Sequence, residues 1–424
     1  MESVRKKNKK TPTLKLVYSF HVNIDSRFDV VIEEISNHMG KFYNMTLYEY
    51  HQKNYLTQNQ FYNKFKEHLR CGYLQSHTYI YAIKQCMKDM SSFYALLELY
   101  KEDPKKNQDP SLPRYKHENR KMTPTFLKNA IRKKDDFLLL SIGKKMKKDK
   151  DLKCIDINLP KQVSKFLSDK NIKVVTLKRL SNGKYEVRVI YEIDKPKLIN
   201  ASEVMAIDLG VSNLAAITFK ESQNQILIDG NIIKSRIAIY NNQIAEQQSK
   251  HMIIIGSDDF KATNRMKKTL ATRRGFVDYY IHKASKMIID IAVEHRVGKV
   301  VIGDFKGIKQ RNKIKYFVQI PHHRLINQIK YKAAKNGIQV IMMNEAYTSS
   351  VSSVDLEKIE KESSDKSRRI MRGAFVTTKG MINSDINGSL NILRKYLGEN
   401  NIPRLIQSMR DKGFRENPIR LRVV

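Results

Sequence analysis

The segment from 204 to 218 constrains the fold of this chain more than any other. Its sequence is Val-Met-Ala-Ile-Asp-Leu-Gly-Val-Ser-Asn-Leu-Ala-Ala-Ile-Thr, so an apolar strand delivers one carboxylate, Asp208, into a glycine turn before a second apolar strand. Ionised carboxylates are rarely buried without a partner. Asp208 is therefore either a metal ligand or a turn aspartate beside Gly210. The same strand–Asp–Leu–Gly pattern also occurs in sugar-kinase-like ATPases.

The charge of the chain indicates its partner. Lys and Arg number 79 against 43 Asp and Glu in 424 residues, a formal net charge of +36. An excess of this size opposes compaction unless a polyanion neutralises it, and nucleic acid is the obvious polyanion. A lysine-rich, AT-biased genome would explain the preference for Lys over Arg, but it would not explain the deficit of acids.

Neither the apolar segments nor the cysteines point to a membrane or an oxidising compartment. No apolar run reaches the ~18 residues of a membrane span, and the first ten residues lack the apolar core of a signal peptide. The three cysteines, Cys71, Cys86 and Cys154, are too widely spaced for a disulfide framework or a CxxC metal clamp. We expect a cytoplasmic protein with no membrane partner.

Hydrophobic periodicity divides the chain into four parts. Strand-like alternation at Leu14–Val22 gives way to helical spacing from about Phe28 to Tyr100, and strands return after a proline-rich break. Asn182-Gly183 predicts a hairpin between two of the later strands. We therefore expect a β-domain at 1–27 and 104–198, a helical domain inserted at 28–103, an α/β domain at 199–400 and a basic tail at 401–424.

The α/β domain has the element order of the RNase H-like nucleases. The pattern predicts strands at 204–208, 214–219, 226–229, 299–304 and 338–344, with helices after the third, fourth and fifth. In that order the first strand lies beside the fourth, and the fourth lies beside the fifth. Carboxylates at the ends of these strands, with one on the last helix, would converge on two metals.

The last helix begins with a second acidic motif. It is Asp385-Ile-Asn-Gly-Ser-Leu-Asn391, in which Asp385, Gly388 and Ser389 would share one face. Small residues on that face let a helix approach a sheet closely. Asp385 could instead cap the helix, although Ser384 could also serve as the cap.

These two segments resemble the TnpB family of transposon-encoded RNA-guided nucleases and, more distantly, the type V CRISPR effectors. The resemblance implies a multidomain α+β chain: an RNase H-like (RuvC) nuclease domain preceded by a wedge-like β-barrel domain with an inserted helical recognition domain. Further motifs stand in family order: Leu112-Pro113-Arg-Tyr-Lys116, Arg273-Arg274, His282-Lys-Ala-Ser285, Val300-Val-Ile-Gly-Asp304, Tyr331-Lys-Ala-Ala334, Asn344-Glu345-Ala-Tyr-Thr-Ser349 and Arg372-Gly373.

One departure from the family concerns the third acid. Most members carry a glutamate at the end of the fourth strand, where this chain has Gly303. Asp304 follows, but side chains alternate along a strand, so Asp304 should point away. Glu345, at the end of the neighbouring strand about 4.8 Å away, is the candidate replacement, as in a subset of the family. Glu345 could also be a surface acid paired with lysines.

A second departure concerns zinc. The family usually holds a four-cysteine ribbon before the last aspartate, but residues 346–384 contain neither cysteine nor histidine. No zinc site can be built from such a segment. We therefore expect an acidic, zinc-less insertion loop at 346–384.

Basic residues of the nuclease domain are candidates for nucleic-acid contacts. The resemblance implies that the helices between the third and fourth strands face the guide–target heteroduplex, although any one residue could equally lie on a solvated helix face. The predicted contacts are Arg265, Lys267, Lys268, Arg273, Arg274, Lys283, Lys309, Arg311 and Arg372.

The function implied by the resemblance is RNA-guided cleavage of double-stranded DNA. A guide RNA and a short target-adjacent motif would select the site, and Asp208, Glu345 and Asp385 would bind two Mg²⁺ ions, with Mn²⁺ as a substitute. The chain would act as a monomer on one RNA in a prokaryotic cytoplasm, associated with the nucleoid. The vacancy at Gly303 motivates an alternative, a nuclease-dead RNA-guided transcriptional repressor. A DNA-strand transferase is a third and weaker hypothesis.

Overall fold

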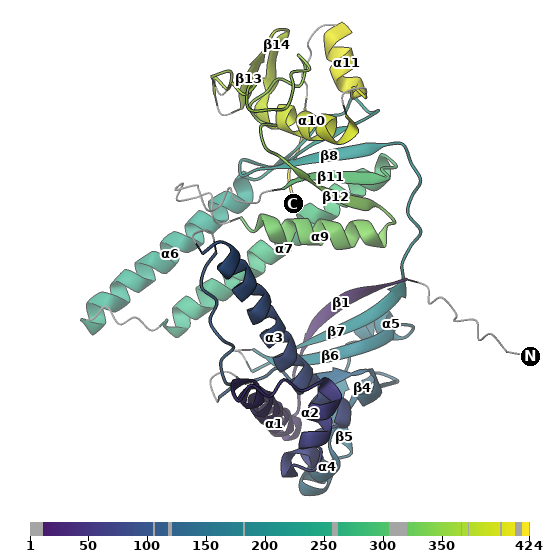
Figure 1. The fold of residues 1–424 in the computed structure, drawn as a ribbon, viewed down its shortest axis with the longest axis vertical. Coiled ribbons are helices and arrows are strands. Elements are labelled where there is room, and N and C mark those ends of the chain that lie inside the picture. The colour runs from purple at the N-terminus through teal and green to yellow at the C-terminus, as the bar shows by residue number, and fades with distance from the viewer. Residues whose placement is uncertain are drawn as a thin grey trace, which may run out of the picture. The chain divides into compact units, whose positions relative to one another are not determined.

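The computed structural model describes residues 12–104, 107–117, 121–180, 183–256, 262–304, 320–365, 367–371, 373–398, 401–411 and 418–423. The chain divides into two compact units, Met1–Asp194 and Lys195–Val424. Figure 1 shows the elements of each unit. The division falls close to the 198/199 boundary predicted from the sequence.

The helices of unit 1 between residues 26 and 102 form where helical periodicity predicts them. They are α1 (Ser26–His51), α2 (Gln58–Phe65), the short η1 (Leu69–Tyr73) and α3 (Ser76–Glu102). Asp25 caps α1 by accepting from the backbone of Arg27, and Thr57 and Gln60 form a capping box on α2. Phe42 and Tyr79 meet edge to face in the fully buried interior between α1 and α3.

The strands of unit 1 form two sheets. One has the order β1 (Thr13–Val22), β7 (Tyr185–Asp194), β6 (Asn171–Arg179) and β2 (Thr125–Leu127); the other contains β3 (Ile131–Lys134), β4 (Phe137–Ser141) and β5 (Cys154–Asn158). The antiparallel β6–β7 pair confirms the predicted hairpin, although Asn182 lies outside the described residues. Among the described strands no closed barrel is seen, so the wedge-like barrel stays a prediction.

The helices and strands of unit 1 share one hydrophobic core. Phe42 of α1, Tyr79 of α3, Phe126 of β2 and Val187 of β7 all belong to it. Two short helices, α4 (Lys144–Lys150) and α5 (Lys161–Leu167), pack against the same core through Met146 and Leu167. The helical block therefore packs continuously with the β-elements.

Unit 2 is built on a six-stranded sheet. Its order is β12 (Gln339–Asn344), β11 (Lys299–Asp304), β8 (Val204–Leu209), β9 (Asn213–Phe219), β10 (Ile226–Asp229) and β15 (Ile419–Leu421). β8 pairs parallel with β11, and β11 pairs parallel with β12. The predicted neighbours of the first, fourth and fifth strands are therefore confirmed.

Helices cover both faces of this sheet (Figure 1). One face packs against α7 (Asn264–Glu294) and α9 (His322–Lys335) through residues such as Ile207 and Ile302. The opposite face packs against α10 (Ser384–Leu397) through Ala206 and Val301. Because successive side chains of a strand point to opposite faces, residue parity decides which face each polar residue joins.

Four further elements complete the described part of unit 2. They are the long helix α6 (Asn231–Ile255), the hairpin β13 (Ala374–Thr377) with β14 (Gly380–Asn383), and α11 (Arg404–Asp411). Within the described parts of the chain, no helix is long and apolar enough to cross a membrane.

Candidate functional site

Asp208 lies on the face of β8 that packs against α10. Ala206, two residues earlier, belongs to the core on that face, so parity turns Asp208 the same way. The approach of its carboxylate to α10 is unusually close: a Cβ placed on Gly388 would clash with Asp208 Oδ2. Glycine at 388 therefore lets the carboxylate of Asp208 lie directly on the helix backbone.

Glu345 occupies the space that a side chain at 303 would fill. A Cβ built on Gly303 would lie 2.6 Å from Glu345 Oε2 and 3.5 Å from Glu345 Cβ. Gly303 and Met343 are register partners on β11 and β12, and Glu345 follows Met343 by two residues on the same face. Because Gly303 on β11 has no side chain, the carboxylate of Glu345, which follows β12, can occupy that space.

Asp385 lies in the first turn of α10, within reach of the turn that follows β8. The side-chain amide of Asn213 donates a 2.7 Å hydrogen bond to Asp385 Oδ2. Arg369 lies 3.6 Å from Asp385 Oδ1. The helix cap is Asn383, whose side chain accepts from the backbone of Asp385, so the carboxylate of Asp385 itself is not used for capping.

The charges of Asp385 and Glu345 act on the carboxylate of Asp208. Burial raises the pKa of Asp208 well above its usual range, and the negative charges of Asp385 and Glu345 raise it further. Burial and the nearby charge of Asp304 raise the pKa of Glu345 to about 7. Crowded carboxylates of this kind favour either protons or a cation.

The oxygen-only donor set suits a hard divalent cation such as Mg²⁺. Asp208, Glu345 and Asp385 are each partly solvent-exposed, so a substrate phosphate could approach them. Within the described residues, no three or more His, Cys, Asp or Glu side chains meet in one metal-binding cluster. Of the three, Asp208 is the acid on which the charges of the other two act.

Sequence analysis did not identify the asparagines of α10 as part of the site. Asn387 donates to the carbonyl of Val351 at 2.8 Å and accepts from the backbone N–H of Ser353. Asn391 donates to the carbonyls of Thr348 and Val351. These buried side-chain amides hydrogen-bond the segment that follows Glu345 and hold it against α10. They therefore fix the position of Glu345.

Ser389 of the same motif ties α10 to the strand that carries Asp208. Its hydroxyl donates to the carbonyl of Ala206 at 3.1 Å and contacts the hydroxyl of Thr218 at 2.9 Å. Each residue of the Asp385–Asn391 motif that is neither aliphatic nor an acid therefore has a contact within the site. A sequence pattern of small and amide residues on one helix turn was the available signal.

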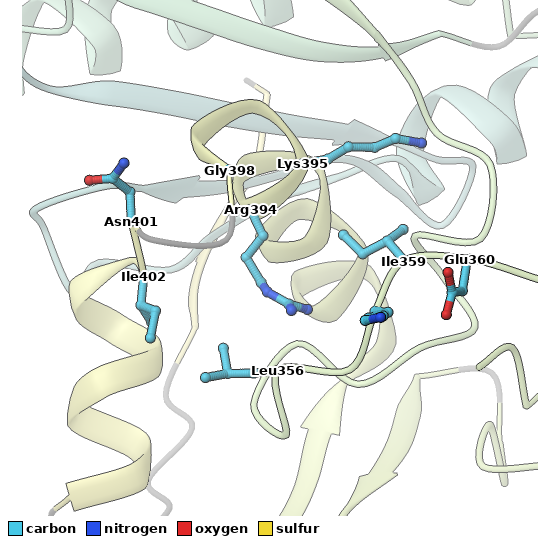
Figure 2. A pocket seen from close by; sticks show the side chains of 9 residues that line it. Leu356, Ile359, Glu360, Arg394, Lys395, Gly398, Asn401 and Ile402 are labelled. Atoms are coloured by element: carbon cyan, nitrogen blue, oxygen red, sulfur yellow. The ribbon is translucent and has the colours of Figure 1, made fainter. Parts of the chain in front are cut away.

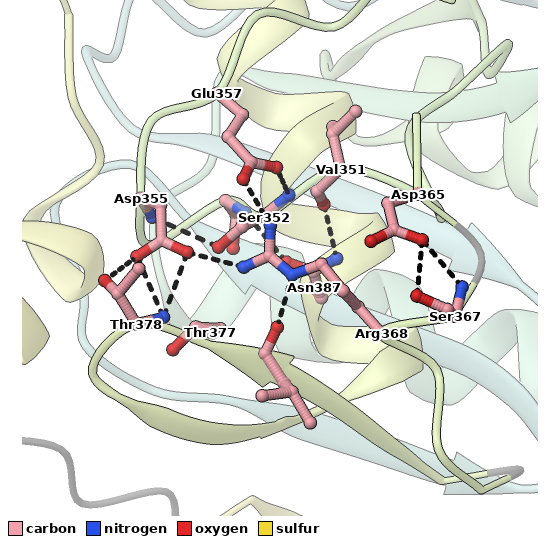
Figure 3. A network of polar contacts seen from close by, with 12 residues as sticks. Val351, Ser352, Asp355, Glu357, Asp365, Ser367, Arg368, Thr377, Thr378 and Asn387 are labelled. Atoms are coloured by element: carbon pink, nitrogen blue, oxygen red, sulfur yellow. Dashed lines mark hydrogen bonds and ion pairs between the residues drawn. The ribbon is translucent and has the colours of Figure 1, made fainter. Parts of the chain in front are cut away.

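Arg368 joins several parts of the segment without cysteines (Figure 3). Arg368 donates to the carboxylates of Asp355 (2.7 Å) and Glu357, and its Nε donates to the carbonyl of Val376 at 2.9 Å. The guanidinium also lies 5.2 Å from the ring centre of Phe375. Asp355 and Glu357, two of the acids that make this loop acidic, are therefore ion-paired within the loop.

The other end of α10 borders a hollow of about 560 Å³ (Figure 2). Arg394 reaches from the helix toward this segment and donates to the carbonyl of Glu357 at 2.9 Å. Arg394 lies nine positions after Asp385, which corresponds to roughly 14 Å along the helix. This hollow is therefore distinct from the carboxylate site.

The predicted nucleic-acid contacts divide into two groups. Six lie on α7, where only Arg273 is half-buried and the others are exposed; from Asn264 to Val277 the helix has no acidic residue. The six are Arg265, Lys267, Lys268, Arg273, Arg274 and Lys283. The remaining three, Lys309, Arg311 and Arg372, lie outside the described residues.

Two family models match the chain. The OrfB_IS605 model, described as a probable transposase, matches residues 184–309. The model of the Cas12f1-like TNB domain matches residues 322–392. The two matches include Asp208 in the first case, and Glu345 and Asp385 in the second.

Individual relatives agree with the family models. The chain is 26% identical over 243 residues to the CRISPR-associated endodeoxyribonuclease Cas12f2 of a Micrarchaeota archaeon, a match that covers 53% of this chain and 43% of that protein. It is 26% identical over 216 residues to the TnpB-like protein ORF457 of Acidianus two-tailed virus, covering 49% of this chain and 44% of that protein. The matches thus span less than half the length of these two relatives.

A solved structure supports the fold. A Cas12f1 chain, from the cryo-EM structure of a Cas12f1–sgRNA–target DNA complex, superposes with a TM-score of 0.63 at 14% identity, covering 87% of this chain and 83% of that one. The sequence matches show that the chain is related to the TnpB-like and Cas12f proteins, and the structural similarity bears on the fold alone.

Proposed function

We propose that this protein is an RNA-guided DNA endonuclease that binds a structured guide RNA, recognises a short motif beside its target and cuts the target at the carboxylate site of unit 2. The observation that carries the proposal is the position of Glu345, whose carboxylate fills the space above Gly303 on the same sheet face as Asp208. The three acids of a nuclease site are thereby available although the usual strand position lacks one.

Asp208, Glu345 and Asp385 would hold the divalent metal, Mg²⁺ or Mn²⁺, with two ions expected. When bound there, the metal supplies Lewis-acid stabilisation of the charge that develops on the phosphodiester. Asn213 orients Asp385 through the hydrogen bond to Oδ2. Gly388, which has no side chain, lets the carboxylate of Asp208 lie close to the backbone of α10. Second-sphere contacts of this kind commonly set metal affinity.

Partners follow from the charge and the relatives. The exposed basic face of α7 suits a nucleic-acid backbone, which is bound largely through phosphates. Relatives named as endodeoxyribonucleases and a similar fold solved with guide RNA and target DNA support RNA and DNA as the partners here. Sequence choice would rest with base pairing, and the protein would read backbone shape.

The nuclease-dead repressor is the less favoured alternative. It was motivated by the vacancy at Gly303, and the presence of Glu345 in that space removes the motive. A DNA-strand transferase stays a third hypothesis: the model that covers Asp208 is described as a probable transposase, whereas the model that covers Glu345 and Asp385 is that of a Cas12f1-like domain.

The decisive experiment begins with the RNA that co-purifies with the full-length protein. We expect sequencing of that RNA to yield one structured species that ends in a variable guide. The complex, reprogrammed with a chosen guide, should cut a matching plasmid in Mg²⁺ when one flanking motif from a randomised library is present. A heterogeneous mixture of RNA fragments, with no guided cutting, would contradict the proposal.

Substitutions then test the site. Asp208→Ala and Asp385→Ala should abolish cleavage while guided DNA binding, measured by gel shift, remains. Glu345→Gln should also abolish cleavage, whereas the neighbouring Asp304→Asn should retain most of it. If only Asp304→Asn is inactive, the assignment of the third acid is wrong.

A further inference from the structure

A second candidate site lies in unit 1, on the outer side of the three-stranded sheet. Helix α4 and strands β3–β5 enclose an open hollow of about 820 Å³. Five cations and one acid line it: Arg132, Lys144, Lys147, Lys148, Lys153 and Asp151. We propose that this hollow, named here the α4 hollow, binds the phosphate backbone of unpaired RNA.

Helix α4 is fixed by one set of residues and presents another to the hollow. Lys145 lies over the ring of Tyr73, Asp149 accepts from the hydroxyl of Tyr73, and Lys150 pairs with Glu34. Lys144, Lys147 and Lys148 are spaced so that they share one face of the helix. The helix is therefore held in place by contacts that leave its lysine face available.

The five cations have no compensating partners in the described structure. Neither an ion pair nor a side-chain hydrogen bond with another described residue engages Arg132, Lys144, Lys147, Lys148 or Lys153, all of which are exposed. Like charges that converge on a concave surface raise the local positive potential and attract a polyanion. Phosphates are the natural counter-charge in a nucleic-acid-binding protein.

The sheet forms the floor of the α4 hollow. Arg132 and Leu139 are cross-strand partners, and Leu139 also pairs with Asp156. The alternate residues Leu138 and Leu140 are fully buried on the opposite face. The hollow thus occupies the solvent face, where Asp151 and Asp156 are the nearby acids, so five cations face two carboxylates.

Two side chains on this face narrow the kind of ligand that we expect in the α4 hollow. Burial and the hydrogen bond to Asp156 raise the pKa of Cys154 to about 11, so its thiol stays neutral and adds no negative charge. Phe137 lies on the same face as Leu139 and is 43% exposed, which leaves its ring free to stack on a base. Spread cations beside an exposed ring fit a run of unpaired nucleotides better than a single phosphate ion.

The choice of RNA over DNA rests on the proposed function, in which RNA is the resident partner. Lysine acetylation followed by mass spectrometry can test the α4 hollow in the full-length protein stripped of nucleic acid. The probes are a short unstructured RNA, the DNA of the same sequence and inorganic phosphate. Lys161 and Lys165 of α5, exposed and outside the hollow, serve as controls in the same sample.

We expect the RNA to slow acetylation of Lys144, Lys147 and Lys148 at least about fivefold relative to Lys161 and Lys165. Equal protection by DNA would overturn the choice of RNA, and protection by phosphate alone would reduce the hollow to a small-anion site. Protection of Lys267 and Lys268 on α7 without the hollow would refute this inference and leave the proposed function intact. Protection of neither group would contradict both.

A matched pair of variants adds an affinity measurement. Lys147→Gln/Lys148→Gln removes two cations from the α4 hollow, and Lys161→Gln/Lys165→Gln removes two from α5. Each lost phosphate contact lowers the slope of the logarithm of the binding constant against the logarithm of the salt concentration by about 0.7. Two lost contacts therefore weaken RNA binding about 25-fold at about 0.1 M salt. The α5 pair should bind like wild type, and thermal melts should show both variants folded. Equal affinities for the two variants would refute the inference.

Discussion

Replacing Gly303 with alanine should impair the proposed nuclease activity without unfolding the protein. The new Cβ would lie 2.6 Å from Glu345 Oε2 and 3.0 Å from Ile392 Cδ1, whereas ordinary contacts begin at 3.4 Å. The difference, 3.4 minus 2.6, requires the carboxylate to move by about 0.8 Å. A misplacement of about 1 Å in a catalytic group costs on the order of 100-fold in rate, so we expect a fall of that order.

Stability should change little because the Glu345 side chain can move. Crowding against Ile392 costs up to about 2 kcal/mol, partly offset by the lower chain entropy of alanine in the unfolded state. The measurement is single-turnover cleavage of a matched DNA by the purified guide complex, with thermal unfolding in parallel. Gly275→Ala is the control, since a Cβ on that exposed helical glycine meets no atom within 4 Å.

The outcome decides whether Glu345 acts from the position seen here. Near wild-type cleavage by Gly303→Ala, together with inactive Glu345→Gln, would refute the packing argument. A complementary variant, Gly303→Glu with Glu345→Ala, moves the acid to the neighbouring strand. We expect it to recover part of the activity that Glu345→Ala loses.

Two further variants test residues that support the site. Asn213→Ala removes the hydrogen bond to Asp385 Oδ2 and should raise the Mg²⁺ concentration for half-maximal cleavage about 10- to 100-fold, measured by metal titration; an unchanged titration would argue against orientation by Asn213. Arg368→Met leaves the half-buried carboxylates of Asp355 and Glu357 unpaired and should destabilise the loop by about 3 kcal/mol, seen as faster proteolysis between residues 350 and 378. Lys361 is an exposed lysine of the same loop, so the control variant Lys361→Met should be digested at the wild-type rate. The wild-type protein should also be digested at an unchanged rate after treatment with a metal chelator. Faster digestion in the chelator would contradict a loop held by Arg368.

Much of the fold was predictable from hydrophobic pattern alone. The buried strands of unit 2 are short apolar runs bounded by turns, and their order along the chain leaves few allowed topologies. The elements that sequence analysis missed are short: β2, β3, α4, α5, β13, β14, α11 and β15 have between three and eight residues each. Such segments carry little periodic signal and form because tertiary neighbours complete their hydrogen bonds.

The site was predictable only in part. Asp208 and Asp385 stood out because each acid sits in a specific motif beside glycine and small residues. Asn387 and Asn391 could not be assigned roles, because their partners lie 34 to 43 residues away in the chain. The role of Arg368 was not predicted either, because its two acids lie 11 and 13 residues earlier in a loop without periodic structure.

The sequence by itself determined which acids were available and that residues 346–384 hold no cysteine or histidine to bind zinc, and its RNase H-like order of elements indicated which strands to expect as neighbours. Only the tertiary structure decided that Glu345 fills the space above Gly303 and that Arg368 holds the loop together. Local hydrophobicity predicts where the strands lie along the chain, and the RNase H-like order of the elements predicts how they are arranged in the sheet. Which side chain fills a given space depends on register and packing between segments that the chain separates, and these exist only once it has folded.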